Sequence, residues 1–383
     1  MNTHNQGDVA LAIQPHLESI SVPPHITSVL EVDTQAITHN YRTLKQLVSH
    51  STCAAVLKAD AYGFGIKAVA PILMQSGCQH FFVAHIEEGI VLRRLLKEPV
   101  IYVLSGLLPQ TEAYFIEHSL TPIINDFEML NMWSREAQRL DRKLPCALHI
   151  DTGMRRNGFD ALDLVKLFKS PELLNHFDVH FIMSHLVSSH ALHDPLNGEQ
   201  KELFDHVRQQ LPQLKASLAD TGGIYLGSPF HYDFIRAGKG LFGLYTPPKD
   251  YPPLEPCLRF LGRILQIRTA VKGETVGYGA THTLAGKSRL ATIGIGFADG
   301  YDLRLSNKGY VAFQDWKAPI VGRISMDYTV IDVTDIPESL CYVGGWAELV
   351  NQTLTLDTLA QSIGSHSREL STGFTSRITR IYR

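Results

Sequence analysis

Short apolar runs alternate with helix-like stretches over about two hundred residues, and this alternation limits the possible folds most strongly. Runs of strand length occur at residues 80–84 (HFFVA), 100–104 (VIYVL) and 120–124 (LTPII). Residues 86–95 (IEEGIVLRRL) are typical of a helix between the first two runs. With roughly eight such strand–helix units, we expect an α/β fold in which a (β/α)₈ barrel of the TIM type is favoured over an open doubly wound sheet. No glycine-rich dinucleotide fingerprint follows the first strand, which agrees with this choice.

The pattern changes after a proline-rich stretch at residues 246–253 (TPPKDYPP), which has the composition of a domain linker. Beyond it, apolar residues alternate at strand spacing, for example at residues 263–271 and 329–333. The TIM-type barrel is therefore predicted to be followed by a mainly β C-terminal domain. The expected domains are a polar N-terminal extension at residues 1–26, the barrel at 27–253 and the β domain at 254–383.

The composition excludes several classes of protein. Lys and Arg number 35 against 38 Asp and Glu, and a formal net charge of -3 gives no basis for binding nucleic acid or an anionic membrane. The five cysteines are scattered without a C-x-x-C pair, so we expect no metal site, no disulfide framework and a reducing compartment. The N-terminal residues lack a secretory signal, and no apolar run is long enough to span a bilayer. A cytoplasmic protein is expected.

Lys58 is the residue with the clearest chemical potential. It follows the apolar run AAVL and precedes a glycine-containing turn, within the string AAVLKADAYGFG. The run is typical of a buried strand in a parallel sheet. An ammonium group at the end of such a strand is partly desolvated, which lowers its pKa and favours a Schiff base with a carbonyl compound. The alternative is a lysine that extends from a strand end into solvent.

The string around Lys58 resembles the pyridoxal-phosphate lysine motif of the alanine racemase family, AVVKANAYGHG. By this resemblance, Lys58 holds pyridoxal 5'-phosphate as a Schiff base and Tyr62 contacts its phosphate. Phe64 departs slightly from the family pattern. The motif alone also admits the non-catalytic pyridoxal-phosphate carriers, so the later motifs decide between the two classes.

Further motifs of the same family imply the contacts to cofactor and substrate. HIDTGMRRNGF resembles KVDTGMxRLGF and implies that Arg156 contacts the cofactor's phenolic oxygen and the substrate carboxylate, which a guanidinium fork suits well. IRAGKGLFG resembles VRPGIALYG and implies that Arg236 faces the pyridine nitrogen. The same resemblance assigns the phosphate to Gly238 and the backbone N–H of Lys239, with Thr221 at a position where the family usually has serine.

The contact of an arginine with the ring nitrogen has a chemical consequence. Arginine does not give up its proton, so the nitrogen that it contacts stays unprotonated. The ring is then a weaker electron sink, and a carbanion formed on it is short-lived. This behaviour suits a racemase, which must avoid transamination.

VGYGATHTL matches the family's VGYGxTY and implies that Tyr278 is a second acid–base group. A racemase needs two such groups on opposite faces of one planar carbon, here Lys58 and Tyr278. Because an unperturbed phenol titrates near pH ~10, a hydrogen-bond chain through His185 to Arg236 is expected to favour the phenolate. The family also implies that Tyr278 reaches the partner subunit's lysine, in a head-to-tail homodimer. GRISMDYTVIDVT resembles GRICMDQxxVDVT and implies that Met326 offers its backbone N–H to the substrate carboxylate.

Three positions depart from the family pattern. His149 stands where many members carry a carbamoylated lysine, so Arg156 must be held by something else, for example a bound anion. Phe297 and Arg368 replace two tyrosines expected at the substrate entrance. Alanine is the expected substrate, and serine or a broader set is the alternative that the changed entrance raises.

The resemblance covers about residues 30 to 383 and implies an alanine racemase that interconverts L- and D-alanine by a two-base mechanism and supplies D-alanine for peptidoglycan. One alternative is an amino-acid racemase of broader specificity that acts on serine or lysine. Another, from a different class, is a non-catalytic pyridoxal-phosphate carrier, although such carriers lack the C-terminal β domain and its tyrosine. A decarboxylase of the same barrel type is disfavoured, because its glycine triplet and its cysteine–aspartate motif are both missing.

Overall fold

The protein is described by a computed structural model that covers residues 22–383. The predicted N-terminal extension lies outside the described residues as far as residue 21. The chain folds into two compact units, and each is described by itself below. One unit is continuous and spans Asp33–Cys257, and the other joins the described residues up to Val32 to Leu258–Arg383.

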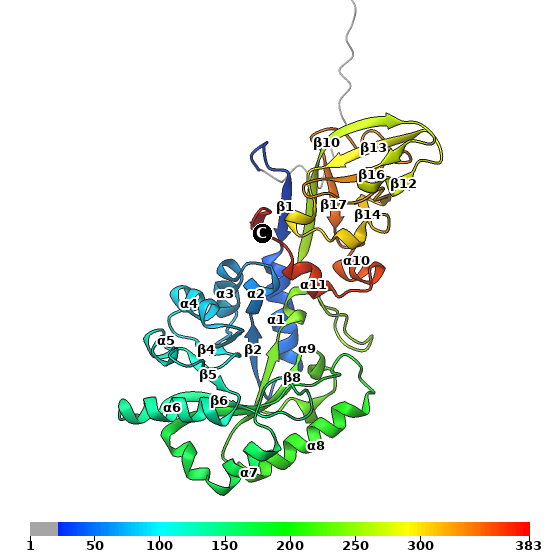
Figure 1. Cartoon of the computed structure of the whole chain (residues 1–383). Coiled ribbons are helices and arrows are strands. Elements are labelled where there is room, and N and C mark those ends of the chain that lie inside the picture. The colour runs from blue at the N-terminus through cyan, green and yellow to red at the C-terminus, as the bar shows by residue number, and fades with distance from the viewer. Residues whose placement is uncertain (1–21) are drawn as a thin grey trace, which may run out of the picture. The chain divides into compact units, whose positions relative to one another are not determined.

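The continuous unit is a closed barrel of parallel strands with helices on its outside (Figure 1). The (β/α)₈ barrel expected from the sequence is therefore confirmed. Its strands are, in order around the barrel, β2 (Thr52–Val56), β3 (His80–Val83), β4 (Val100–Val103), β5 (Thr121–Ile124), β6 (Leu144–His149), β7 (Phe177–Met183), β8 (Ala216–Asp220) and β9 (Phe234–Ala237). The longer helices are α1 (Thr34–Leu47), α3 (Ile66–Gln75), α4 (Ile86–Leu95), α6 (Phe127–Arg139), α7 (Ala161–Lys169) and α8 (Pro195–Gln210).

Helix α1 shows how local sequence starts and orients a barrel helix. Asp33 caps the helix by accepting hydrogen bonds from the backbone N–H groups of Gln35 and Ala36, each at 2.9 Å. Ile37, Tyr41 and Leu44 recur at helical spacing, and all three are buried. A helix with one apolar face must bury it, so α1 packs that face toward the strands.

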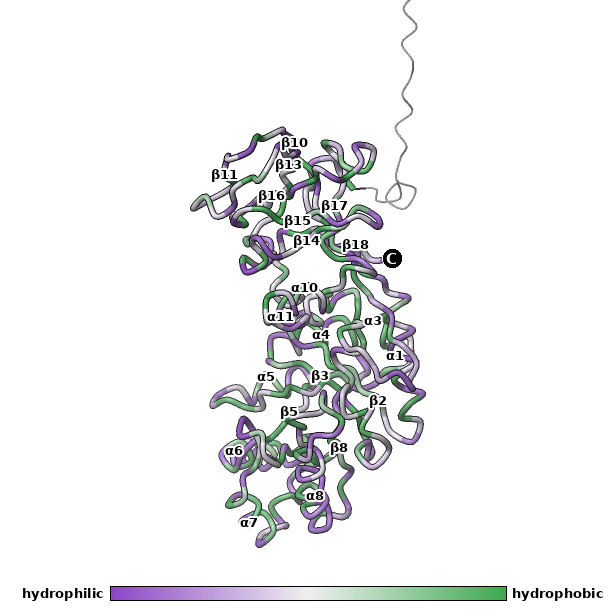
Figure 2. Tube along the Cα trace, turned by 90° about the vertical axis from the view of Figure 1, so that its right-hand side faces the viewer, coloured by the Kyte–Doolittle hydropathy of each residue, from purple (hydrophilic) through white to green (hydrophobic). Residues whose placement is uncertain are grey.

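The barrel interior is filled by side chains, so it is a packed core. Ala54, Phe82, Ile123, Ala147 and Phe181 belong to one buried cluster contributed by five different strands. Figure 2 colours the Cα trace by hydropathy, and barrel helices such as α6 and α8 carry both hydrophobic and hydrophilic residues. Filling the interior in this way leaves the ends of the strands as the places where polar groups can gather.

A chain of polar side chains from β3, β4 and β7 interrupts the apolar interior. The Tyr102 hydroxyl lies 2.9 Å from Nδ1 of His180 and 3.3 Å from Nδ1 of His80. His180 Nε2 in turn lies 3.5 Å from a carboxylate oxygen of Asp178. Burial, and then the charges of His180 and Lys215, lower the pKa of His80 to about 4. The imidazole of His80 is therefore neutral at physiological pH.

The second unit is mainly β, as expected. Its eight-stranded sheet runs in the order β15-β14-β17-β10-β1-β18, and β13 and β16 extend it beside β10. The strands are β1 (Ser28–Val32), β10 (Leu258–Ala270), β13 (Ser288–Ile293), β14 (Tyr310–Phe313), β15 (Trp316–Pro319), β16 (Thr329–Asp332), β17 (Trp346–Val350) and β18 (Thr379–Tyr382). A hairpin, β11 (Thr275–Val276) with β12 (His282–Thr283), and two helices, α10 (Leu356–Ser362) and α11 (Ser367–Thr372), complete the unit.

Strand β1 belongs to this sheet, whereas the sequence assigned its residues to the barrel range 27–253. It pairs antiparallel with β10 and parallel with β18, and all five of its residues are buried. Burial on both sides is the physical reason, because a strand flanked by two partners satisfies its backbone polar groups and hides both faces. Periodicity reports that a segment is a strand and does not report its partner.

Within residues 22–383 no helix has the length and apolar character needed to cross a membrane. In the same range, no group of three or more His, Cys, Asp or Glu side chains is arranged to hold a metal ion. The five cysteines are all free and buried.

The neutral His80 predicts a pH dependence of stability. An unfolded histidine binds a proton near pH ~6.5, so between there and about pH 4 the unfolded chain holds more protons than the folded one. The free energy of unfolding should therefore decrease as the pH falls through this range. Urea unfolding midpoints of wild type and His80→Gln, compared from about pH 8 to about pH 5, should show a shallower decline in the variant. Identical slopes would contradict the assignment of a neutral His80.

A second prediction concerns Tyr301, whose side chain is 3% exposed and whose hydroxyl has no hydrogen-bond partner among residues 22–383. Tyr301→Phe removes a buried unsatisfied group, so stability should stay constant or rise, by up to about 1–3 kcal/mol. Thr329→Val in the same unit is the control, because the Thr329 hydroxyl donates to Ile295 O at 2.8 Å. That control should lose about 1 kcal/mol in urea unfolding. A loss of similar size in Tyr301→Phe would show that its hydroxyl has a partner.

Candidate active site

The candidate residues of the barrel lie at the carboxyl ends of neighbouring strands. Lys58 follows β2, His185 follows β7 and Thr221 follows β8. Arg236 lies within β9, and Gly238 comes directly after that strand. Strand β9 pairs with β2 on one side and with β8 on the other, and β8 pairs with β7. Because all these strands are parallel, the five positions gather at one rim of the barrel, where TIM-type enzymes carry their chemistry.

The turn after Lys58 has an unusual backbone. The short helix α2 (Lys58–Tyr62) contains Ala59, Asp60 and Ala61 at φ values of 54°, 51° and 56°, and Tyr62 follows at 57°. Four successive left-handed residues cost roughly 1–2 kcal/mol each for side chains with a Cβ. Such a turn persists only when its surroundings hold it.

A small cradle of polar groups lies between the ends of β2, β8 and β9. The Thr221 hydroxyl oxygen accepts hydrogen bonds from the backbone N–H groups of Gly238 at 3.1 Å and Gly240 at 3.2 Å. With both lone pairs used, its own proton is left to donate. A Cβ at Gly238 would lie 2.5 Å from the Tyr62 hydroxyl, so only glycine allows that hydroxyl to sit there. Hydroxyl donors that converge beside a glycine backbone fit an anionic group such as a phosphate.

Arg236 is a buried cation at the same rim, with a side chain only 4% exposed. Its guanidinium donates to the Ser217 hydroxyl and Ser184 O, each at 2.5 Å, and to Leu218 O at 3.2 Å. Burial lowers the pKa of Arg236 to about 10, against the attraction of Asp220, so the group stays charged near neutral pH. Two of its five N–H groups, at Nε and at Nη1, have no partner among residues 22–383. They can donate to an acceptor such as a heteroaromatic ring nitrogen.

His185 lies among charged groups of this rim. Burial lowers the pKa of His185 below its usual range, and the nearby cations Arg236, Arg156 and Lys58 act in the same direction. The Asp220 carboxylate opposes them, and it also caps helix α9 (Thr221–Ile224) by accepting from Gly223 N at 2.9 Å. A neutral imidazole can relay a hydrogen bond here without adding another positive charge.

His149, at the last residue of β6, has a defined tautomer. Its Nδ1 lies 2.9 Å from Asn125 Oδ1, while the Asn125 amide nitrogen donates to Ile123 O at 3.2 Å. The amide oxygen is therefore the acceptor, and His149 must carry its proton on Nδ1 with Nε2 free of a proton. Burial, and then the charge of Arg236, lower the pKa of His149 to about 3. The family resemblance implies a negatively charged carbamoylated lysine at this position, whereas the imidazole of His149 is uncharged.

Arg156 is exposed in the loop after β6. The same loop is ordered by Asp151, which accepts from Gly153 N at 2.9 Å and from Arg155 N at 3.1 Å. Arg155 also approaches the Asp151 carboxylate at 3.6 Å. Arg155 is thus tied to its own loop, whereas the charge of Arg156 acts on His149 and His185.

Tyr278 and Met326 belong to the C-terminal unit and are described there alone. The Tyr278 side chain is 72% exposed on a short turn, η4 (Tyr278–Ala280). Gly277 and Gly279 on either side have φ values of 72° and 74°, which a residue with a Cβ rarely adopts. Gly277 also packs against the backbone of Arg323, where a Cβ would lie 3.2 Å from its nitrogen. The two glycines therefore hold Tyr278 outward.

The turn that carries Met326 is held by backbone contacts. Phe297 N donates to Ser325 O and Ala298 N donates to Met326 O, each at 3.0 Å. A Cβ at Gly296 would lie 2.3 Å from both Ser325 O and Met326 O, so glycine is required for this approach. The Met326 N–H has no hydrogen-bond partner within the described part of the chain, and its side chain is 56% exposed. The Met326 N–H can therefore donate to an acceptor from outside the described residues.

Arg377 ties the same turn to a buried carboxylate. Its guanidinium contacts Asp327 Oδ1 at 2.8 Å and Asp299 Oδ1 at 3.3 Å. Asp299 is 4% exposed and accepts from Gly296 N at 2.9 Å. No sequence motif indicates Arg377 or Asp299, because neither stands next to the residue that it supports. Phe297 and Arg368, the two departures at the expected entrance, are both exposed in this unit.

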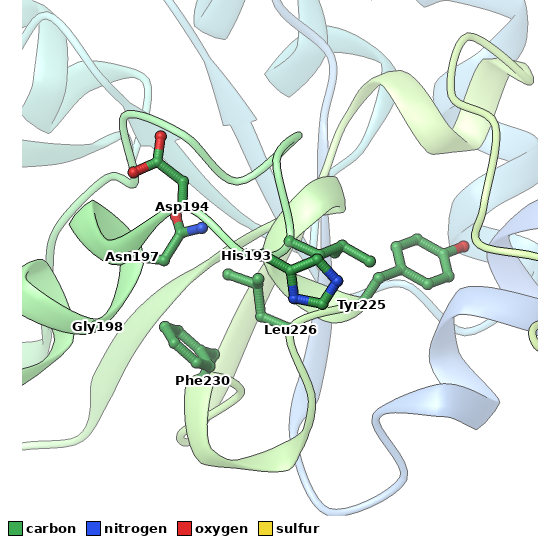
Figure 3. A pocket seen from close by; sticks show the side chains of 8 residues that line it. His193, Asp194, Asn197, Gly198, Tyr225, Leu226 and Phe230 are labelled. Atoms are coloured by element: carbon green, nitrogen blue, oxygen red, sulfur yellow. The ribbon is translucent and has the colours of Figure 1, made fainter.

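One cavity of about 370 Å³ lies elsewhere on the barrel (Figure 3). It is lined by residues of the segment before α8, its first turn and the segment 225–230, among them His193, Asn197 and Phe230. None of the residues predicted from the sequence lines it. The strand ends, rather than this cavity, carry the candidate chemistry.

Comparisons with known proteins agree over nearly the whole chain. The family described as "Alanine racemase, N-terminal domain" matches residues 32–246, and "Alanine racemase, C-terminal domain" matches residues 257–382. The alanine racemase of Brucella abortus is 36% identical over 368 residues, which cover 92% of this chain and 93% of that protein. The alanine racemase of Rhodospirillum rubrum is 38% identical over 358 residues, covering 93% and 96%. A crystal structure of alanine racemase from Bartonella henselae with covalently bound pyridoxal phosphate is similar with a TM-score of 0.90 at 37% identity, over 93% of this chain and 99% of that one.

Proposed function

Since this chain belongs to the alanine racemase family, we propose that Lys58 and Tyr278 are the two groups that move the α-proton between the faces of alanine. The protein is an isomerase that interconverts L-alanine and D-alanine, with pyridoxal phosphate as its cofactor. When bound, this cofactor withdraws electrons from the α-carbon and makes its proton acidic. In the family this activity supplies D-alanine for peptidoglycan.

The cradle at the strand ends is the observation that carries the proposal. Tyr62, Thr221 and Gly238 would hold the phosphate, together with the backbone of Lys239. The two hydroxyls would donate to it, and Gly238, whose own N–H donates to Thr221, leaves space that a Cβ would fill. Lys58 begins the turn that ends at Tyr62, so the amine and the phosphate site belong to one short segment.

Arg236 would contact the ring nitrogen of a bound cofactor through N–H groups that no described residue uses. Because its guanidinium stays charged, it would donate to that nitrogen and would not protonate it. We further propose that His185, whose pKa is lowered by burial, relays a hydrogen bond from Arg236 toward the Tyr278 hydroxyl in the assembled site. This series of hydrogen bonds would favour the deprotonated form of the Tyr278 phenol, whose oxygen can then accept a proton.

Two residues bind the substrate carboxylate in this proposal. Arg156 offers a guanidinium fork from the loop after β6, where Arg155 is already tied to Asp151. Met326 offers a backbone N–H that has no partner among the described residues. Lys58 Nζ then takes or returns the α-proton on one face, and Tyr278 Oη does so on the other.

The family resemblance further suggests that the site is shared by two chains. We infer a head-to-tail homodimer in which Tyr278 of one chain acts with Lys58 of the other, which agrees with the high exposure of Tyr278. No role for nucleic acid or a membrane is proposed. The cytoplasmic location that the scattered cysteines suggest stays a prediction.

Racemisation of alanine in heavy water tests the two-base proposal. Wild type should convert L-alanine to D-alanine with deuterium at the α-carbon, and Tyr278→Phe should lose at least about a hundredfold in turnover, because one of two proton-transfer groups is missing. The measurement is chiral chromatography with mass detection. L-Serine and L-lysine are assayed alongside, and faster conversion of either would assign the broader specificity that Phe297 and Arg368 raise. If Tyr278→Phe kept full turnover, the role of Tyr278 would be refuted.

Mixing two inactive variants tests the shared site. In a head-to-tail dimer of Lys58→Ala with Tyr278→Phe, one of the two sites keeps both native groups. Equal amounts of the variants, allowed to exchange subunits, should therefore recover about a quarter of wild-type activity. Either variant alone serves as the control. No recovery, with exchange verified by native mass spectrometry of tagged chains, would place both groups in one subunit.

A further inference from the structure

Glu88 makes contacts that its own helix does not require. It is the third residue of α4, and one of its carboxylate oxygens, Oε2, accepts from Ala84 N at 2.7 Å and His85 N at 3.2 Å. The other oxygen, Oε1, accepts from Ala59 N at 2.5 Å. We propose that Glu88 is a positioning residue that holds the left-handed turn after Lys58 and so fixes the direction of the Lys58 amine.

The turn lacks a cap of its own. Leu57 stands at the position that precedes α2 and provides no side-chain hydrogen bond to it. Ala59 is the first of the left-handed residues, and its N–H donates to Glu88 Oε1. The carboxylate of Glu88 supplies the missing acceptor from the next strand–helix unit. A charged acceptor makes a stronger bond than a neutral one.

Other bonds close the far end of the same segment without reaching Ala59 N. Asp60 Oδ1 accepts from Ile66 N at 2.8 Å, and Asp60 O accepts from Gly65 N at 2.9 Å. They hold the end of the turn to the start of α3. At the beginning of the turn, Leu57 O accepts from Ala61 N at 2.9 Å, and Glu88 Oε1 is the acceptor for Ala59 N.

The two carboxylate oxygens have separate tasks, and this separation makes the inference testable. Oε2 satisfies the start of α4, as a glutamate three residues after a helix cap commonly does. Oε1 serves the Lys58 turn. In Glu88→Gln the carbonyl oxygen can serve only one of these sides, and the amide NH₂ faces a backbone N–H on the other. Because α4 presents two donors and Ala59 only one, the lost bond should be the one to Ala59.

The inference rests on the proposed role of Lys58 as the cofactor lysine. Cofactor-free protein is titrated with pyridoxal phosphate, the adduct is reduced with borohydride, and the modified peptide is identified by mass spectrometry. Glu88→Gln should need about tenfold more pyridoxal phosphate for half-maximal labelling of Lys58 than wild type, as expected for a lost bond to a charged group. Unchanged labelling would overturn the inference.

Two matched controls separate positioning from general destabilisation. Glu87→Gln makes the same chemical change at the exposed neighbouring position, and it should label like wild type. Asp33→Ala removes a helix cap elsewhere in the barrel, where Asp33 accepts from Gln35 N and Ala36 N. It should lower the melting temperature by about 1–3 °C while labelling of Lys58 stays unchanged. Reduced labelling in Asp33→Ala equal to that in Glu88→Gln would show that Glu88 acts only through stability.

Hydrogen exchange of the cofactor-free wild type provides a readout that needs no variant. The Ala59 amide should be protected to a degree similar to that of Ala84, because both donate to the same carboxylate. Exchange of Ala59 at the rate of an open loop would refute the contact. Labelling at a lysine other than Lys58, or labelling that survives in Lys58→Ala, would instead refute the proposed cofactor lysine, so the two failures are distinguishable.

Discussion

Pairing between β2 and β9 closes the barrel, and the arrangement at its rim depends on this contact between distant parts of the chain. In the register, Ala54 lies opposite Arg236 and Ala55 opposite Ala237. Lys58 and Gly238 each follow a few residues later, so the closing pair sets their separation. Backbone hydrogen bonds that join residues about 180 apart in sequence form only when the intervening strands are in place, as in any structure of high contact order. The part of the candidate site that lies at the strand ends therefore forms only when the barrel is complete.

The rim combines one buried cation with histidines that stay neutral. Arg236 is charged and nearly inaccessible, and its burial is supported by three hydrogen bonds to oxygen atoms. His149 and His185 lie within the reach of that charge, and both have pKa values below the usual range. A protonated histidine would add a second positive charge beside Arg236, and for His185 the desolvation cost outweighs the attraction of the Asp220 carboxylate. The site thus fixes where protons are, which a proton-transfer enzyme requires.

The turns that carry Tyr278 and Met326 are held in a different way, by glycines that let two backbone segments approach closely. Gly296 lies against the Met326 turn where any Cβ would collide with two carbonyl oxygens, and Gly277 gives the Tyr278 turn a backbone that other residues avoid. The glycines at these positions allow the backbone contacts that fix the conformation of the two turns. The functional roles of Tyr278 and Met326 remain predictions from the family resemblance, and the geometry explains how each is presented.

The sequence by itself determined the barrel, the mainly β C-terminal domain and the family, because strand and helix periods are local and the motif around Lys58 is continuous. It also located the strand-end residues, since each follows an apolar run directly. It did not reveal that β1 joins the C-terminal sheet, that Glu88 reaches the turn after Lys58, or that Arg377 supports the Met326 turn. Each of these is a contact between segments far apart in the chain. Local patterns record which face of an element is buried, and only the folded chain decides which backbone groups and charges meet there.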